Sequence, residues 1–208
     1  MVNKKLLKGI YVLSDAILTP KETILSQIER VLQSGVSVIQ FREKYASDDE
    51  IESTCRELCD LCKRYNALFI IDDRAHLAKK VDADGLHVGE DDISYEEARA
   101  IMGVDKIIGI SCYGNIERAI KFEALGVDYV AFGSFFASPT KPNSKVVPLG
   151  VLHKAREVLH VPICAIGGIN AENIGEVASS KIAMYSVISA VYENDTIEKN
   201  IQKLQSYI

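Results

Sequence analysis

The segment from residue 38 to residue 44 reads VIQFREK and ends in long polar side chains at every second position. Alternate side chains of a β-strand point to the same face. In a strand, Gln40, Arg42 and Lys44 would therefore converge on one small volume. Two cations and an amide in that volume indicate an anion-binding site, and the planar guanidinium of Arg42 suits bidentate recognition of a phosphate group.

Carboxylates follow two other apolar runs of the chain. Asp72 and Asp73 come directly after LFII, while Glu90, Asp91 and Asp92 follow GLHVG. Carboxylates from neighbouring strand ends are a common way to hold Mg²⁺, which keeps several waters and binds substrate phosphates. We therefore expect Asp73 and Asp92 to hold Mg²⁺ that bridges to a diphosphate. Taken singly, these motifs also fit a charged strand end and a solvated loop, but their clustering at successive strand ends favours a functional site.

Two other groups of residues are expected to be structural. His87, in GLHVGE, is expected to pack near a strand end rather than to bind a metal or transfer a proton. Cys55, Cys59 and Cys62 have the spacing of one helix face and lack the paired pattern of a zinc site. We expect them to be reduced thiols on an apolar face.

Short β-rich runs alternate along the chain with segments of helical periodicity. The predicted strands are 10–15, 38–43, 68–72, 85–88, 106–111, 129–133, 162–168 and 182–187. The predicted helices are 21–34, 48–65, 75–81, 94–102, 115–125, 148–158, 171–179 and 195–206. Ser47 and Ser94 are predicted N-caps of two of these helices.

Eight strand–helix units predict an α/β fold of the (β/α)8 TIM-barrel type, with one domain over residues 1–208. Apolar runs without strict alternation are typical of parallel strands that are buried on both faces. An open, doubly wound sheet is the alternative architecture. In a barrel, the functional site lies where the strands end and the following loops begin, which is where the cations and carboxylates described above fall.

Composition limits the kinds of partner. The chain has 208 residues, 48% of them hydrophobic, and a net charge of −5 without a basic block. This charge argues against a nucleic-acid-binding or membrane-surface protein, whose partners are polyanions. The sequence shows no signal-length apolar segment and no membrane span, so we expect a cytoplasmic protein. The oligomeric state is left open, with a homo-oligomer among the options.

Taken in order, the motifs YVLSD, VIQFREK, IIDDR, DADGLHVGEDD, GISCY, VDYVAFGSFFASPTK and PICAIGGIN resemble the thiamine phosphate synthase family, also called thiamine-phosphate pyrophosphorylase. The resemblance spans nearly the whole chain. It implies a (β/α)8 barrel that joins 4-amino-2-methyl-5-hydroxymethylpyrimidine diphosphate to 4-methyl-5-(2-phosphoethyl)thiazole, or to its carboxylated form. The products would be thiamine phosphate and diphosphate.

The resemblance also implies roles for individual residues. Gln40, Arg42, Lys44 and Lys141 would bind the diphosphate of the pyrimidine substrate, and Asp73 and Asp92 would hold Mg²⁺. Ser111 would lie beside the pyrimidine and the departing diphosphate, so Arg42, Ser111 and Lys141 are the expected catalytic residues. Ser138 and Thr140 match hydroxyl positions near the thiazole phosphate, with main-chain contacts from Gly168, Ile188 and Ser189.

Several positions depart from the family's usual pattern. Asp72, a predicted substrate-binding residue, replaces an asparagine, and Glu90 replaces a glutamine; Met184 aligns with a glycine, and SPTK at residues 138–141 stands where the family has TTTK. The first two changes add negative charge near the expected diphosphate. Alternatives to a synthase are a thiazole tautomerase-like relative, a non-catalytic protein that binds thiamine phosphates, and another phosphate-handling barrel. Retention of Asp73 and Asp92 favours the synthase over the tautomerase.

Overall fold

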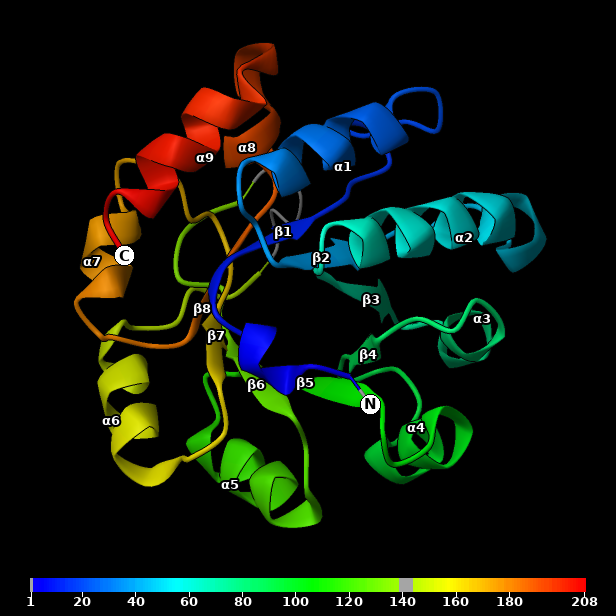
Figure 1. The fold of residues 1–208 in the computed structure, drawn as a ribbon. Helices are drawn as coiled ribbons and strands as arrows, with labels where there is room; N and C mark the ends of the chain where they lie inside the picture. Colours follow the sequence, from blue (N-terminus) through cyan, green and yellow to red (C-terminus); the bar gives the residue numbers. More distant parts are fainter. Residues whose placement is uncertain (1, 139–143) are drawn as a thin grey trace.

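The computed structural model describes residues 2–138 and 144–208 and shows a closed barrel of eight parallel strands, surrounded by helices (Figure 1). The strands are β1 (Gly9–Leu13), β2 (Val38–Phe41), β3 (Leu68–Asp72), β4 (Gly85–Val88), β5 (Ile107–Tyr113), β6 (Tyr129–Phe132), β7 (Ile163–Ala165) and β8 (Met184–Val187). They follow chain order around the barrel, and β8 pairs with β1 over four residue pairs, from Gly9–Met184 to Val12–Val187. The predicted (β/α)8 barrel is confirmed, and the open sheet is excluded.

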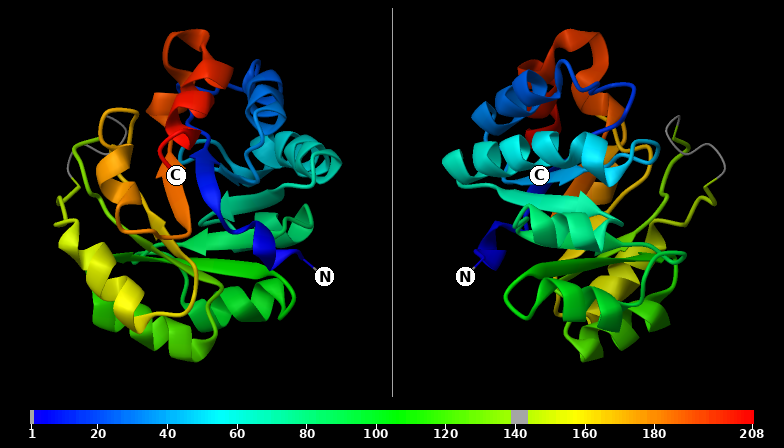
Figure 2. Two further views of the ribbon diagram at one scale, coloured as in Figure 1. Left: turned by 60° about the vertical axis from the view of Figure 1, so that its left-hand side comes forward. Right: turned by 90° about the vertical axis from the view of Figure 1, so that its right-hand side faces the viewer.

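Helices cover the outside of the barrel, as the turned views also show (Figure 2). They are α1 (Ile24–Gln33), α2 (Asp48–Arg64), α3 (Ala75–Lys80), α4 (Tyr95–Met102), α5 (Ile116–Leu125), α6 (Gly150–Val158), α7 (Ile174–Ala178), α8 (Ser189–Tyr192) and α9 (Ile197–Gln205). Short 3-10 turns occur at Lys4–Leu6 and Glu193–Asp195. Among the described residues, no helix is both long and apolar enough to cross a membrane.

Each strand is buried on both faces, which explains why its sequence lacks strict alternation. In β3, Phe69 and Ile71 belong to the cluster between sheet and helices, whereas Leu68 and Ile70 belong to the cluster inside the barrel. The inward-facing positions change from apolar to polar toward the carboxyl ends of the strands. In β2, for example, Val38 is followed on the inner face by Gln40, so one end of the barrel interior is apolar and the other end is polar.

The predicted helix starts at Ser47 and Ser94 are confirmed. In both cases the serine and the glutamate three residues later form a reciprocal capping box. The serine hydroxyl and the glutamate carboxylate thereby satisfy amide groups that the first helical turn leaves unpaired. The cysteine prediction is also confirmed, because Cys55, Cys59 and Cys62 are buried on one face of α2 and are free thiols.

The boundaries differ from the prediction at strand ends near the rim. β2 ends at Phe41 rather than at residue 43, because the Arg42 amide donates to Ser14 Oγ (2.8 Å) instead of continuing the ladder. β7 ends at Ala165 rather than at residue 168, since Gly167 and Gly168 have φ values of 103° and 64° that turn the chain away. The four-residue helix α8 was not predicted, because it is too short to show helical periodicity.

The opposite end of the barrel has a second, smaller hollow. It lies at the amino ends of the strands and is lined from both ends of the described chain, by the segment around Lys8 and by the segment around Tyr207. The two segments therefore meet on the face away from the polar strand ends.

Candidate active site

A cavity of about 940 Å³ opens at the carboxyl ends of the strands, and residues from all eight strands or the loops directly after them line it. It brings together most of the residues that the sequence singled out: Gln40, Arg42, Lys44, Asp72, Asp73, Asp92, Ser111, Ser138, Gly168, Ile188 and Ser189. Thr140 and Lys141 lie outside the described residues. The prediction that the strand-end residues share one site is thus met by the geometry, while the chemical role of each residue stays a prediction.

A cluster of ion pairs occupies the side of the cavity next to β2 and β3. The Lys44 ammonium lies 3.0 Å from Asp72 Oδ2 and also contacts Asp73 Oδ2. Arg42 is held more loosely, with its guanidinium 3.8 Å from Asp72 and 3.9 Å from Asp15. Long, partly solvated ion pairs of this kind contribute little to the stability of the folded protein. The Arg42 fork can therefore turn to an incoming anion at small cost.

Asp73 and Asp92 come from consecutive strand ends, as predicted. Asp73 has a left-handed backbone conformation (φ 62°), and its amide donates to the His87 carbonyl across β3 and β4 at 2.9 Å. This contact turns the chain sharply at the strand end. Asp92 Oδ2 accepts a hydrogen bond from the Gly89 amide at 2.6 Å, which folds the loop after β4 back on itself. Both carboxylates line the cavity.

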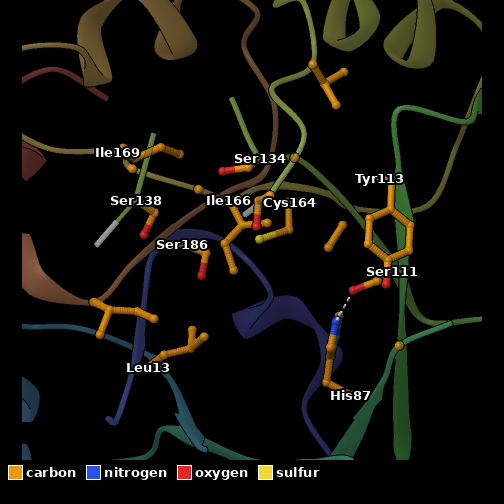
Figure 3. A pocket seen from close by; sticks show the side chains of 18 of the residues that line it. Leu13, His87, Ser111, Tyr113, Ser134, Ser138, Cys164, Ile166, Ile169 and Ser186 are labelled. Carbon is orange, nitrogen blue, oxygen red and sulfur yellow. Dashed lines mark hydrogen bonds between the residues drawn. The ribbon is translucent and has the colours of Figure 1, made fainter. Parts of the chain in front are cut away.

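A chain of hydrogen bonds crosses the floor of the cavity. Gln40 Nε2 donates to the Tyr11 hydroxyl (2.8 Å), which lies 3.0 Å from the Tyr129 hydroxyl. The Tyr129 hydroxyl lies 2.8 Å from His87 Nδ1, and His87 Nε2 lies 2.9 Å from Ser111 Oγ (Figure 3). The predicted packing position of His87 is correct. However, its ring also links a site serine to the buried tyrosines.

Burial sets the protonation of this chain. It raises the pKa of Tyr11 and of Tyr129 well above the ordinary value for tyrosine, so both phenols keep their protons. Burial also lowers the pKa of His87, an effect that nearby Lys44 reinforces and that Asp72 and Asp92 oppose. The imidazole is therefore neutral, with a proton on one nitrogen only.

Main-chain groups and hydroxyls line the other side of the cavity. Gly168 approaches the backbone of Phe136 and Ala137 so closely that a Cβ atom would overlap both. Ile188 and Ser189 lie at the start of α8, directly after β8. Ser138 and Ser186 lie on this side in the close-up view, across the cavity from His87 and Ser111 (Figure 3).

Sequence reasoning did not single out Tyr11, Tyr129 or Ser186. All three are buried inside the barrel, and Ser186 Oγ lacks a hydrogen-bond partner among the described residues. Their signal was available, since each is a polar group at an inward-facing position of an otherwise apolar strand. This signal could be used only once it was known which alternate residues of each strand face the barrel interior.

The departures from the family pattern at Asp72, Glu90 and Met184 occupy different environments. Asp72 is an ion-pair partner of Lys44 at the cavity wall, and Glu90 is an exposed residue at the cavity rim. Met184 is fully buried in the barrel interior, in the apolar cluster that includes Tyr11 and Cys164. It is absent from the cavity lining, so this departure fills the core rather than changing the site surface.

The described lining residues carry more negative than positive charge. The carboxylates are Asp72, Asp73, Glu90, Asp91 and Asp92, and the cations are Arg42, Lys44 and Lys145. Within the described part of the chain, no three or more His, Cys, Asp or Glu side chains are grouped so as to hold a metal ion. A polyanionic ligand would meet net repulsion here unless another cation accompanied it.

Such a barrel, with cations, carboxylates and hydroxyls gathered around one cavity at its strand ends, has the arrangement typical of barrel enzymes. Comparison with known proteins is more specific. The family model for thiamine monophosphate synthase matches residues 10–191, and the chain belongs to this family.

Similarity to individual proteins extends over nearly the whole chain. The chain is 40% identical over 198 residues to a thiamine-phosphate synthase of Thioalkalivibrio sulfidiphilus, and the alignment covers 95% of this chain and 94% of the relative. It is 42% identical over 202 residues to the Wolinella succinogenes thiamine-phosphate synthase, covering 95% and 92%. A solved thiamine phosphate pyrophosphorylase from Pyrococcus furiosus superimposes with a TM-score of 0.89 at 34% identity, covering 99% of this chain and 97% of that one.

Proposed function

We propose that this protein is a thiamine-phosphate synthase, a transferase of thiamine biosynthesis. It would join 4-amino-2-methyl-5-hydroxymethylpyrimidine diphosphate to 4-methyl-5-(2-phosphoethyl)thiazole and release diphosphate; with the carboxylated thiazole, CO2 would be released as well. The full-length similarity to synthases carries this proposal, and the cavity at the strand ends supports it. These similarities favour the synthase over the tautomerase and the non-catalytic binding protein.

The reaction requires one bond to break and one to form. The bond between the pyrimidine methylene carbon and the diphosphate oxygen breaks, and its electron pair leaves with the diphosphate. The electron-rich aminopyrimidine stabilises the methylene cation that remains, and the lone pair of the thiazole nitrogen then forms the new C–N bond. No protein nucleophile is needed, so the enzyme's contribution is alignment and stabilisation of the leaving group.

Arg42 and Lys44, which line the cavity, are proposed to stabilise the leaving group. Charge grows on the diphosphate as the bond breaks, and charge-assisted hydrogen bonds to it strengthen in step. Lys44 would exchange its carboxylate partners for the diphosphate, and the Arg42 guanidinium would donate two parallel hydrogen bonds to it. Ser111, which lines the cavity, would donate a hydrogen bond to the departing group.

The site fits Mg²⁺ on two grounds. The donors are hard carboxylate oxygens, and a cationic group already lies against Asp73 in the form of the Lys44 ammonium. In addition, the acidic surplus of the lining leaves room for cationic charge beside a diphosphate. We propose that Asp73 and Asp92 hold the ion, which when bound would act as a Lewis acid toward the diphosphate oxygens. Within residues 2–138 and 144–208, no third side chain joins these two carboxylates in a metal-binding group, and such a pair suits an ion that arrives with its phosphate ligand.

The remaining lining suggests where the second substrate binds. Backbone groups of Gly168, Ile188 and Ser189, together with Ser138, are proposed to contact the thiazole phosphate. Exclusion of water by the bound substrates would protect the methylene cation, which water would otherwise trap. Thr140 and Lys141 are proposed to take part from the segment outside the described residues.

The test is formation of thiamine phosphate from the two substrates, with and without Mg²⁺. We expect turnover that EDTA abolishes and added Mg²⁺ restores. Absence of product from folded protein supplied with both substrates and Mg²⁺ would refute the synthase. Turnover that persists in EDTA would refute only the proposed requirement for Mg²⁺.

A sharper test of the metal uses Asp92→Asn. Asparagine keeps an oxygen that can accept from the Gly89 amide, so the loop after β4 is preserved while the charge is lost. We expect turnover to fall by at least about a hundredfold at limiting Mg²⁺, and excess Mg²⁺ to restore part of it. Glu96→Gln removes an exposed carboxylate from the first turn of α4 and serves as the control with unchanged activity. Equal Mg²⁺ dependence in wild type and Asp92→Asn would remove Asp92 from the metal site.

A further inference from the structure

We propose that Tyr129, a residue outside the cavity lining, is a positioning residue for the reaction. Through Tyr129 the buried hydrogen-bond chain fixes the Nε2-protonated tautomer of His87 and leaves the Ser111 hydroxyl proton free to point into the cavity. The inference deepens the proposed function and rests on it for the role of Ser111. The tautomer can be measured without any turnover.

The direction of donation along this series of hydrogen bonds follows from its first member, Gln40. The Gln40 Nε2 group can only donate, so the Tyr11 oxygen accepts from it at 2.8 Å. Tyr11 has a single proton, and within the described part of the chain the one other hydrogen-bond partner of its hydroxyl is the Tyr129 oxygen at 3.0 Å. A buried hydroxyl proton without an acceptor is costly, so Tyr11 donates to Tyr129.

The same reasoning applies at each further step. Since Tyr129 accepts from Tyr11, its own proton goes to its remaining partner, His87 Nδ1, at 2.8 Å. A nitrogen that accepts a hydrogen bond carries no proton in neutral imidazole. His87 therefore carries its proton on Nε2 and donates it to Ser111 Oγ at 2.9 Å.

Ser111 is the last member of the hydrogen-bond chain, and it lines the cavity. Its oxygen is occupied as an acceptor from His87, so its own proton is free to be donated. His87 and Ser111 both line the cavity, and the close-up view shows the bond between them (Figure 3). A serine held as a donor suits a leaving group that gains negative charge. With the opposite tautomer, Ser111 would donate to His87 and offer the cavity only a lone pair.

Packing makes the Tyr129 hydroxyl hard to replace. Tyr129 is fully buried, and its ring stacks on His87 with centroids 5.5 Å apart. It also packs edge-on against Tyr11 at 6.0 Å. Gly109, opposite it on β5, leaves space that a Cβ atom would fill with direct overlap of the ring. The ring position is thus fixed, and the hydroxyl is aimed at His87.

The experiment compares wild type with Tyr129→Phe, which keeps the ring and removes the hydroxyl. ¹⁵N-resolved NMR spectra of the imidazole groups report the tautomer, and a His87→Asn variant assigns the signal among the four histidines. We expect wild-type His87 to show the Nε2-protonated pattern. In Tyr129→Phe we expect that pattern to be lost or mixed with the Nδ1-protonated form, because Nδ1 no longer has a donor.

Steady-state kinetics give the second readout. We expect Tyr129→Phe to lower kcat by about tenfold to a hundredfold. This fall is smaller than the one expected when a hydrogen-bond donor to the developing charge is removed completely. KM for the pyrimidine diphosphate should change by less than about threefold, since the effect arises as the leaving group gains charge. Tyr11→Phe, one step further from His87, should have a smaller effect in the same direction.

Tyr185→Phe is the matched control. Its hydroxyl is also buried, and it donates to the Ile182 carbonyl in the outer core, away from the cavity. Its kcat and the His87 pattern should equal those of wild type. An Nδ1-protonated His87 in the wild-type protein would overturn the proposal, even if Tyr129→Phe failed to fold. Retention of the Nε2 pattern and of full kcat in folded Tyr129→Phe would overturn it as well, and neither result would affect the synthase assignment.

Discussion

Arg42 illustrates how one residue can serve structure weakly and function strongly. Its side chain reaches Asp15 and Asp72 only at 3.8 to 3.9 Å, with about a quarter of its surface exposed (23%). Surface ion pairs contribute only about 0 to 1 kcal/mol. Hydrogen bonds to a charged group contribute roughly 1.5 to 3 kcal/mol. If the proposed function is right, Arg42 matters far more to the bound diphosphate than to the folded chain.

The first prediction concerns Arg42→Lys, which keeps the charge and loses the two-pronged fork. We expect kcat/KM for the pyrimidine diphosphate to fall by about tenfold to a hundredfold, with the melting temperature close to that of wild type. Arg30→Lys is a matched control, because Arg30 makes a two-pronged ion pair with Glu198 on the outer surface. Wild-type kinetics in Arg42→Lys would show that the fork does not bind the diphosphate.

At the scale of the elements, β5 and β6 depend on a size match inside the barrel. Gly109 of β5 is paired in register with Tyr129 of β6, and the ring of that tyrosine covers the glycine. Interiors are close-packed, so a single extra methyl group has to displace something. Here the displaced group would be the ring that holds His87.

We therefore predict that Gly109→Ala destabilises the protein by about 1 to 3 kcal/mol, as overpacking of a core does, and also lowers kcat. Chemical denaturation measures the first effect and steady-state kinetics the second. Gly175→Ala, in α7, is the comparison: its added Cβ would lie at an ordinary contact distance of 3.4 Å from Tyr207. That variant should be neutral or slightly stabilising. Equal stability of the two variants would mean that the interior of the barrel can accommodate the added methyl group at position 109 without loss of stability.

Element types were easier to predict than element ends. Parallel strands in a barrel need apolar residues on both faces, so the successive apolar residues Phe69 and Ile70 both indicated burial from the sequence alone. The end of β2 was not predictable, because it depends on Ser14, a residue 28 positions away along the chain. The same limit hid Tyr11 and Tyr129, whose importance comes from a hydrogen bond between strands that are distant in sequence.

At the scale of the whole molecule, the described core is built from the sheet and the helices around it, and the five cysteines all lie within it. Burial raises the pKa of Cys55 to about 12 and that of Cys112 to about 12. Only the thiolate reacts with alkylating reagents. The prediction of a single domain over residues 1–208 stays a prediction.

The third prediction is that iodoacetamide at pH 8 leaves the native protein unmodified. A thiol with a pKa near 12 is thiolate in roughly one molecule in ten thousand at this pH, and burial blocks the reagent as well. Mass spectrometry should show alkylation of all five cysteines in guanidinium chloride and of none without it. Rapid labelling of Cys55 or Cys112 under native conditions would show local opening of α2 or β5.

The pairing of β1 with β8 has a consequence for protein engineering. Because every strand has two hydrogen-bonded neighbours, the sheet has no first or last member, and the numbering of its strands records only where the polypeptide happens to start. The segments around Lys8 and Tyr207 both line the smaller hollow on the face opposite the cavity. A short linker between them, with a new break in a loop on that same face such as residues 103–106, would give a circular permutant whose barrel and cavity are those of the parent.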